Sequence, residues 1–229
     1  MKKRTTVKTV AAVVIFALAP GVLLAPHARA GGLLAVGMEI VIGSHSCSLG
    51  FFSFNQENDR LAVTAGHCAD DINQAVYSRN RVEIGTVVSH MPESDSLEPV
   101  RSRGYTLIRL YDNFDIEVFF AGVADAKNGD LVTKFGARSG GTIGRITDVA
   151  NNCSLAEQTI IGSLVAIAGD SGSPWYTAGP TLVGITASSR YSIGGGDDDG
   201  SQAQPVGALV SLIRQNARPW GSGFTVWVK

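Results

Sequence analysis

The feature that most constrains the fold is a series of short apolar segments, rich in β-branched residues, that end in Gly, Asn, Asp or Ser. Such segments are typical of β-strands joined by turns. We expect strands at 39–42, 47–52, 61–65, 82–88, 105–110, 131–135, 142–149, 159–166, 174–176, 181–187 and 224–228. Many short strands with regular turns favour a β-sandwich or barrel over alternating strands and helices.

Helical periodicity is convincing at one place, residues 206–215. Apolar residues recur there at the spacing of one helix face, at Val206, Leu209, Val210 and Ile213. We therefore expect an all-β chain with a C-terminal helix. No linker composition divides it, so if two barrels exist they form one continuous domain, with the change-over near 113–130.

The first 30 residues have the pattern of an export signal. Lys2, Lys3, Arg4 and Lys8 precede an apolar run at 10–19, and Ala28-Arg29-Ala30 forms a small-x-small cleavage site. The run is too short for a comfortable membrane span, although an uncleaved anchor is the alternative. We expect cleavage after Ala30, no stable membrane anchor afterwards, and a secreted domain at 31–229, extracellular or in the cell envelope. Export permits disulfides.

Charge argues against nucleic acid as a partner. Five of the 19 basic residues lie in the first 30 residues, which leaves 14 basic against 20 acidic residues in the rest. A net-acidic domain without a basic stripe binds nucleic acid poorly. Aromatic residues make up only 7% of the chain, so stacking platforms for bases are not expected either.

Two short motifs carry chemistry: TAGHC at 64–68, at the end of an apolar segment, and GDSGSP at 169–174, between two expected strands. A serine hydroxyl is a weak nucleophile and needs an adjacent base, a task that suits histidine. Ser171 and His67 are the candidates. The glycines around Ser171 let the amides of Gly169 and Ser171 point at one spot, where each would stabilise an oxyanion by roughly 3–4 kcal/mol.

Each motif alone has a plainer interpretation, because Gly-Asp-Ser-Gly is a common turn composition and a lone histidine in a β-protein is usually structural. The other histidines of the exported part, His45 and His90, have no patterned neighbourhood and are read as ordinary surface or turn residues. The two motifs together, about a hundred residues apart, are far rarer than either one.

With both motifs the chain resembles the chymotrypsin-fold (trypsin-like) serine proteases, closest to their bacterial streptogrisin-like branch. Weaker similarity extends over nearly all of 31–229, at CSLGF (47–51), GYTLIRL (104–110), GARSGGTIG (136–144), LVGIT (182–186) and QPV before the helix (204–206). The resemblance implies two packed six-stranded antiparallel β-barrels with the active site in the crevice between them. It also implies a monomer that acts on a peptide or protein without a cofactor.

The resemblance fails at one residue. The family's histidine is held in the right tautomer by an aspartate, and alignment of GYTLIRL places Gly104 at that position. Asp115, or Asp95 or Glu98 from the preceding loop, are weak candidates for a replacement. An incomplete triad predicts slow turnover, since replacing the family's aspartate by its amide costs roughly 10⁴ in rate.

The resemblance also pairs Cys47 with Cys68, a bridge worth about 3 kcal/mol for a loop of this length. It leaves Cys153 unpaired, and we expect an inert, partly buried thiol there, with an exposed or intermolecular cysteine as the alternative.

Substrate contacts follow from the same alignment. Val165 falls at the base of the primary specificity pocket, where an apolar residue argues against selection of Lys or Arg. Ala187, Ser188 and Ser189 resemble the segment that pairs with the substrate backbone. The GGGDDDG loop at 194–200 is expected to be a solvated loop, with attraction of basic substrates or a calcium ion as the alternatives. No cluster has the spacing of metal ligands.

Two functions remain. The first is an exported serine endopeptidase-like hydrolase that cleaves peptide or ester bonds through an acyl-enzyme on Ser171. The second is a catalytically silent homologue that binds a peptide or protein in the same cleft. Intact motifs around His67 and Ser171 favour the first function, and the glycine at position 104 favours the second.

Overall fold

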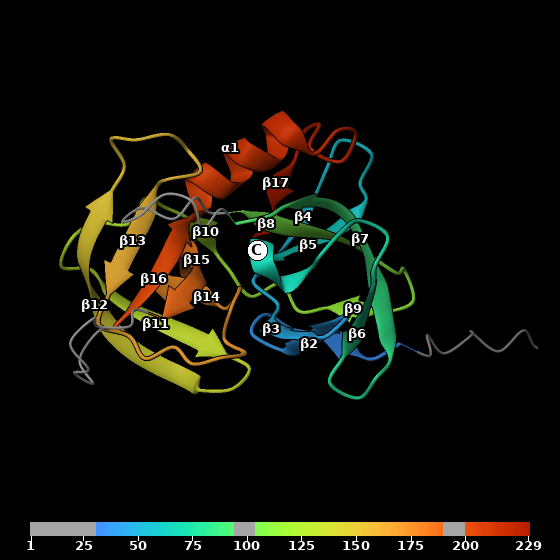
Figure 1. Ribbon diagram of the computed structural model, residues 1–229, viewed down its shortest axis with the longest axis horizontal. Coiled ribbons are helices and arrows are strands. Elements are labelled where there is room, and N and C mark those ends of the chain that lie inside the picture. Colours follow the sequence, from blue (N-terminus) through green and yellow to red (C-terminus); the bar gives the residue numbers. More distant parts are fainter. Residues whose placement is uncertain (1–30, 94–103, 190–199) are drawn as a thin grey trace, which may run out of the picture.

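The computed structural model describes residues 31–93, 104–189 and 200–229 (Figure 1). The expected signal peptide, the candidate acids Asp95 and Glu98, and most of the GGGDDDG loop lie outside these residues. The elements in order are β1 (Leu33–Leu34), β2 (Glu39–Ile42), β3 (His45–Ser48), β4 (Phe51–Phe54), β5 (Arg60–Ala65), η1 (Gly66–Cys68), β6 (Ala75–Ser78), β7 (Glu83–Met91), β8 (Tyr105–Leu110), β9 (Asp115–Ile116), β10 (Gly122–Val123), β11 (Leu131–Gly136), β12 (Gly140–Ala150), β13 (Thr159–Gly162), β14 (Pro174–Thr177), β15 (Thr181–Ser189), β16 (Ser201–Pro205), α1 (Val206–Asn216) and β17 (Thr225–Val226).

The C-terminal half of the chain forms a closed barrel. Its strands follow one another in the order β15, β14, β11, β12, β13 and β16, and β16 pairs back to β15. All of these pairings are antiparallel, and the short β10 adds to β15 in parallel. The interior is filled by apolar side chains that include the fully buried Trp175 and Leu164.

The N-terminal half forms a curled antiparallel sheet in the order β17, β4, β5, β8, β7, β6, β2 and β3. No hydrogen-bonded strand pairing closes this sheet among the described residues, so the molecule combines one closed six-stranded barrel with a curled half-barrel. The expected all-β, chymotrypsin-like class is confirmed, and the second closed barrel is the point of difference. The two short strands β1 and β9 pair separately.

A shared core joins the two halves. Phe51, Leu61 and Leu107 of the first sheet pack in one cluster with Ile185 of the second and with helix α1. The helix turns Leu209 and its apolar neighbours into this cluster, as the spacing over 206–215 predicts. Full burial of each such side chain contributes about 1.5–3 kcal/mol, so the relative position of the halves is held by packing. Figure 1 shows α1 lying across the top of both halves.

The chain leaves the first sheet after β8 and enters the second at β10, and β9 between them pairs with β1. No helix in the described part of the chain is long and apolar enough to cross a membrane.

Candidate active site

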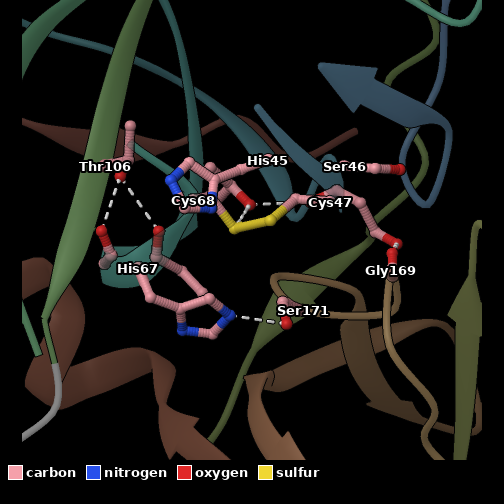
Figure 2. Close-up of a disulfide and its surroundings, with 12 residues drawn as sticks. His45, Ser46, Cys47, His67, Cys68, Thr106, Gly169 and Ser171 are labelled. Atoms are coloured by element: carbon pink, nitrogen blue, oxygen red, sulfur yellow. Dashed lines mark hydrogen bonds between the residues drawn. A yellow bond between two sulfur atoms is a disulfide. The ribbon is translucent and has the colours of Figure 1, made fainter. Parts of the chain in front are cut away.

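His67 lies in a single 3-10 turn, η1, that follows directly on β5. The turn is fixed by a disulfide between Cys47 and Cys68, with Cα atoms 6.1 Å apart, so the expected pairing is confirmed (Figure 2). It is also fixed from β8, because the buried hydroxyl of Thr106 donates to the carbonyl oxygen of Ala65 at 2.9 Å. The histidine therefore stands on a backbone held from both sides.

Ser171 lies in the turn before β14, between the two halves. Its hydroxyl oxygen is 2.6 Å from Nε2 of His67 (Figure 2). The turn is tied to its own barrel by the amide of Gly172, which donates to the carbonyl of Thr186 at 2.7 Å. The two predicted catalytic residues, from motifs 104 positions apart, are thus brought into direct contact.

Ser48, which the sequence analysis did not single out, joins the two halves at this point. Its amide donates to the carbonyl of Ser171 at 2.8 Å, and its hydroxyl donates to the carbonyl of Gly169 at 2.9 Å. The same hydroxyl accepts from the amide of Ala137 at 2.9 Å. Because β3 carries both Ser48 and Cys47, one strand anchors the serine turn and the histidine turn together.

The amides of Gly169 and Ser171 are available at the site. In the part of the chain that the structure describes, neither donates a hydrogen bond to another protein group. Gly169 has φ of +99°, a conformation that residues with a side chain rarely adopt. Free amides beside the serine fit the expected oxyanion role.

Asp170 fixes the turn that carries Ser171 through hydrogen bonds to its buried carboxylate. Its buried carboxylate accepts from the ammonium of Lys134 at 2.8 Å, from the amides of Arg138 and Ser139 at 3.0 Å, and from the amide of Ile167 at 3.1 Å. Burial alone would raise the pKa of Asp170, but these hydrogen bonds outweigh it and hold the pKa at about 2. Burial also lowers the pKa of Lys134, against the opposing effect of Asp170.

A carboxylate lies beside His67, although no expected acid supplies it. Oε1 of Glu93 is 3.0 Å from Nδ1 of His67, on the side of the ring opposite to Ser171. The Glu93 side chain is only 14% exposed. The sequence analysis did not name Glu93 as a candidate, and Asp115, which it did name, is not the acid at this nitrogen. Asp95 and Glu98 lie outside the described residues, so their candidacy stays a prediction.

Gly104 lies next to the histidine turn. A Cβ built on Gly66 would be 2.9 Å from the Cα of Gly104. A Cβ on Gly104 itself would overlap the carbonyl oxygen of Met91, so the position has no room for a side chain. Asp115 lies on β9, paired with Leu33, and the carboxylate that contacts Nδ1 of His67 is that of Glu93.

The predicted substrate-contacting residues lie on β15 and in the segment that precedes the serine turn. Ala187 is buried and Ser188 is half-buried on β15, which also carries the backbone of Ser189. Val165 is 59% exposed, whereas the base of a specificity pocket is a buried position. Because residues 190–199, which continue from β15, lie outside the described residues, the role of Val165 stays a prediction.

Of the two histidines expected to be ordinary surface or turn residues, His45 fits that expectation and His90 does not. His45 hydrogen-bonds Asp70 at the surface, at 3.0 Å. His90 is on β7, and its Nε2 donates to the carbonyl of Gly66 at 2.8 Å, next to His67 in the chain. The residues around His90 in the sequence do not indicate this hydrogen bond to the turn that carries His67.

Cys153 is exposed, so the expectation of a partly buried thiol is wrong. Among the described residues, ligand atoms close enough to share a metal ion are those of Cys47, His67 and Cys68. Both of these sulfur atoms are bonded to each other in the disulfide, so they are not available as thiolate ligands.

The fold is that of solved bacterial proteases. Thermobifida fusca protease A matches at 22% identity with a TM-score of 0.63, covering 86% of this chain and 100% of its own. A Nocardiopsis protease matches at 20% identity and 0.63, covering 85% and 98%. A Cellulomonas bogoriensis chymotrypsin matches at 21% and 0.60, covering 86% and 100%.

No family model and no curated protein matches the sequence. The class that the fold defines is the chymotrypsin-type serine protease fold. Within it, the chain resembles the bacterial, streptogrisin-like branch.

Proposed function

We propose that the protein is an exported serine endopeptidase that cleaves peptide bonds through an acyl-enzyme on Ser171. One observation carries the proposal: the 2.6 Å contact between Nε2 of His67 and Oγ of Ser171. A general base must be within about 2.6–3.2 Å of the proton it removes, and this distance meets that requirement without rearrangement.

The chemistry follows from this contact. His67 Nε2 accepts the proton of the Ser171 hydroxyl as the oxygen attacks the scissile carbonyl carbon. The amides of Gly169 and Ser171 donate to the oxyanion that forms. The protonated His67 then gives its proton to the leaving amine, and a peptide with a new N-terminus departs. Water attacks the acyl-enzyme in the second half-reaction, with His67 again as base.

The buried pair of Lys134 and Asp170 supports the same function. The oxyanion donors must be in place before the transition state forms, because their value depends on preorganisation. Asp170 lies between Gly169 and Ser171 in the chain, and its carboxylate is fixed by donors from the β11–β12 hairpin. These bonds hold the turn in one shape through groups of this chain, which supports a preformed oxyanion site.

The substrate is proposed to be an extended peptide. Residues 184–189 of β15 pair with β16 along one edge, and beyond Thr186, which bonds Ser173, no strand pairs with the opposite edge in the described residues. An extended peptide can add to such an edge by main-chain hydrogen bonds. The nearby surface at Val165, Ala166, Ile167 and Ala168 carries no charge, which favours an apolar side chain before the cleaved bond.

The alternative of a silent binding protein was motivated by the glycine at position 104. The Glu93 carboxylate beside His67 weakens that motive. The experiment that separates the two functions is labelling with a fluorophosphonate probe, together with cleavage of an unbiased peptide library. We expect labelling in the wild type and none in Ser171→Ala or His67→Ala. A folded wild type that neither labels nor cleaves any library peptide would reject the enzyme function.

A further inference from the structure

We propose that Glu93 is the positioning residue of His67, and that Gly104 lacks a side chain because the segment that delivers Glu93 fills its place. The inference rests on the proposed function and specifies how its site is completed. It differs from the arrangement that the family resemblance implies, in which the acid stands at position 104.

The first argument is the geometry around the imidazole. Nε2 of His67 faces Ser171 at 2.6 Å, and Nδ1 faces Oε1 of Glu93 at 3.0 Å. A carboxylate at Nδ1 holds the proton on that nitrogen and leaves Nε2 free to accept the serine proton. Glu93 is mostly shielded from solvent, which strengthens its interaction with the ring. The two atoms are within ion-pair distance in the structure, and under the proposal they form a hydrogen bond in the working enzyme.

The second argument is how the chain delivers Glu93. Strands β7 and β8 are antiparallel, and their last pair joins Met91 to Tyr105. The next residues, Pro92 and Gly104, continue this register. Glu93 therefore leaves β7 across the ladder from the start of β8. The acid that faces His67 therefore stands just after β7, and not just before β8, where the family resemblance places it.

The third argument is the space at Gly104. Its Cα is closely packed against Gly66, and a Cβ on Gly66 would lie 2.7 Å from the carbonyl oxygen of Met91. Three backbones thus meet without side chains between them. A Cβ on Gly104 would overlap the Met91 carbonyl and approach the carbonyl carbon of Pro92 to 2.7 Å. An aspartate at position 104 and the observed path of residues 91–93 exclude each other.

His90 supports the same path. Its ring donates to the carbonyl oxygen of Gly66, so the end of β7 is hydrogen-bonded to the histidine turn that Glu93 serves. Pro92 has a fixed φ and keeps Met91 extended, which limits the directions in which the chain can leave the strand.

The test compares Glu93→Gln with Glu93→Asp in the full exported chain. The matched controls are Asp95→Asn and Glu98→Gln, which remove neighbouring carboxylates. For Glu93→Gln we expect kcat to fall by roughly 10²–10⁴ with KM changed less than about threefold, because the amide presents the wrong group to Nδ1. Glu93→Asp should retain more activity than Glu93→Gln. The two control variants should keep the wild-type kcat.

A spectroscopic readout makes the inference independent of substrate. A proton held between Nδ1 and a carboxylate gives a far-downfield ¹H resonance, which we expect in wild type and not in Glu93→Gln. Retained resonance and activity in Glu93→Gln, with both lost in Asp95→Asn or Glu98→Gln, would overturn the inference and leave the protease function standing. A wild type that shows the resonance but never labels at Ser171 would instead reject the function and keep the contact.

The link to Gly104 is tested by a double-mutant cycle. Gly104→Ala should lower kcat because its methyl group displaces residues 91–93. If it acts through Glu93, the double variant Gly104→Ala/Glu93→Gln should be about as active as the worse single variant, since interacting sites are not additive. If the fold-losses in kcat of the two single variants multiply fully in the double variant, the proposed link between Gly104 and Glu93 is wrong. The melting temperature of each variant separates loss of positioning from loss of the fold.

Discussion

The ammonium nitrogen of Lys134 lies 2.8 Å from a carboxylate oxygen of Asp170, and both side chains are fully buried. Lys134 stands on β11, inside the closed barrel, and Asp170 precedes Ser171, the proposed nucleophile. An ion pair in this place couples the stability of the barrel to the shape of the turn that carries Ser171.

Replacing Lys134 with Met should therefore lower the stability of the barrel and disturb the turn that carries Ser171. Removing one partner of a buried pair leaves an uncompensated charge and costs about 3–5 kcal/mol. We expect that loss in chemical denaturation, together with loss of fluorophosphonate labelling. The double variant Lys134→Met/Asp170→Asn should recover part of the stability, because no buried charge remains. A double variant no more stable than Lys134→Met would contradict this account.

Asp170 also predicts how stability depends on pH. Its pKa is about 2 in the folded protein against an ordinary 3.8, so the folded state favours the ionised form. The resulting stability is fully present above pH 4 and is lost as pH falls from about 4 to 2; it amounts to about 2 kcal/mol. Denaturation midpoints at several pH values should show this slope. Its absence in Asp170→Asn, measured beside wild type, assigns it to this group.

The disulfide gives a third prediction. Replacing Cys47 and Cys68 together by Ala should cost about 3 kcal/mol for a loop of this length. Because Cys68 ends the turn that carries His67, labelling of Ser171 should fall by more than the unfolded fraction explains. The control is Cys153→Ala, which removes an exposed thiol and should change neither property. Peptide mapping without reduction should show Cys47 joined to Cys68, and a bridge to Cys153 would refute the pairing.

Export is a prediction from the sequence alone. The positive residues, the apolar run and the Ala28-Arg29-Ala30 site predict cleavage after Ala30. The intact mass of protein collected outside the cytoplasm should correspond to a chain that begins at Gly31. A mass that includes residues 1–30 would show that the segment is retained.

Elements with strong local signals were predictable. The strand at 39–42 and the strand at 105–110 have the predicted bounds, and helix α1 extends the predicted 206–215 by one residue. The predicted strand at 47–52 is two strands in the structure, β3 and β4, because the chain bends at Leu49 and Gly50. A Cβ on Gly50 would be 2.7 Å from the carbonyl oxygen of Gly172, so the bend reflects a contact with the other half.

Strands that depend on partners were missed. β16 reads SQAQP and has no apolar alternation, but it closes the barrel by pairing with β13 and β15. Its buried Ser201 and Gln204 carry no local signal for a strand. Such a segment is extended because its neighbours supply hydrogen-bond partners, and a sequence pattern does not record that.

The residues of the candidate site also differ in whether a local sequence pattern marks them. His67 and Ser171 stand in motifs whose chemistry is local, and the sequence was enough to find them. Glu93 stands in no motif, and it reaches His67 only because β7 and β8 pair in one particular register. The available signal was indirect: a glycine at the expected acid position, with a carboxylate just after the partner strand. The acids that the sequence analysis named in that loop, Asp95 and Glu98, follow Glu93 by two and five residues.

Gly172 provides the last prediction, because the structure supplies a matched control. Gly172 has φ of +84°, and a Cβ there would overlap the hydroxyl of Thr64 and lie 2.5 Å from the carbonyl oxygen of Ser48. Gly179 has φ of +86°, but a Cβ there would meet nothing closer than 4.0 Å. Alanine at either position carries the left-handed penalty of about 1–2 kcal/mol.

Gly172→Ala should therefore cost clearly more than Gly179→Ala in chemical denaturation, and the difference measures the clash alone. Because the clash pushes the serine turn away from β3, Gly172→Ala should also lose labelling at Ser171. Gly179→Ala, in the distant turn between β14 and β15, should label like wild type. Equal losses of stability in the two variants, with labelling intact in both, would mean that β3 and the serine turn are not packed as closely as the structure describes.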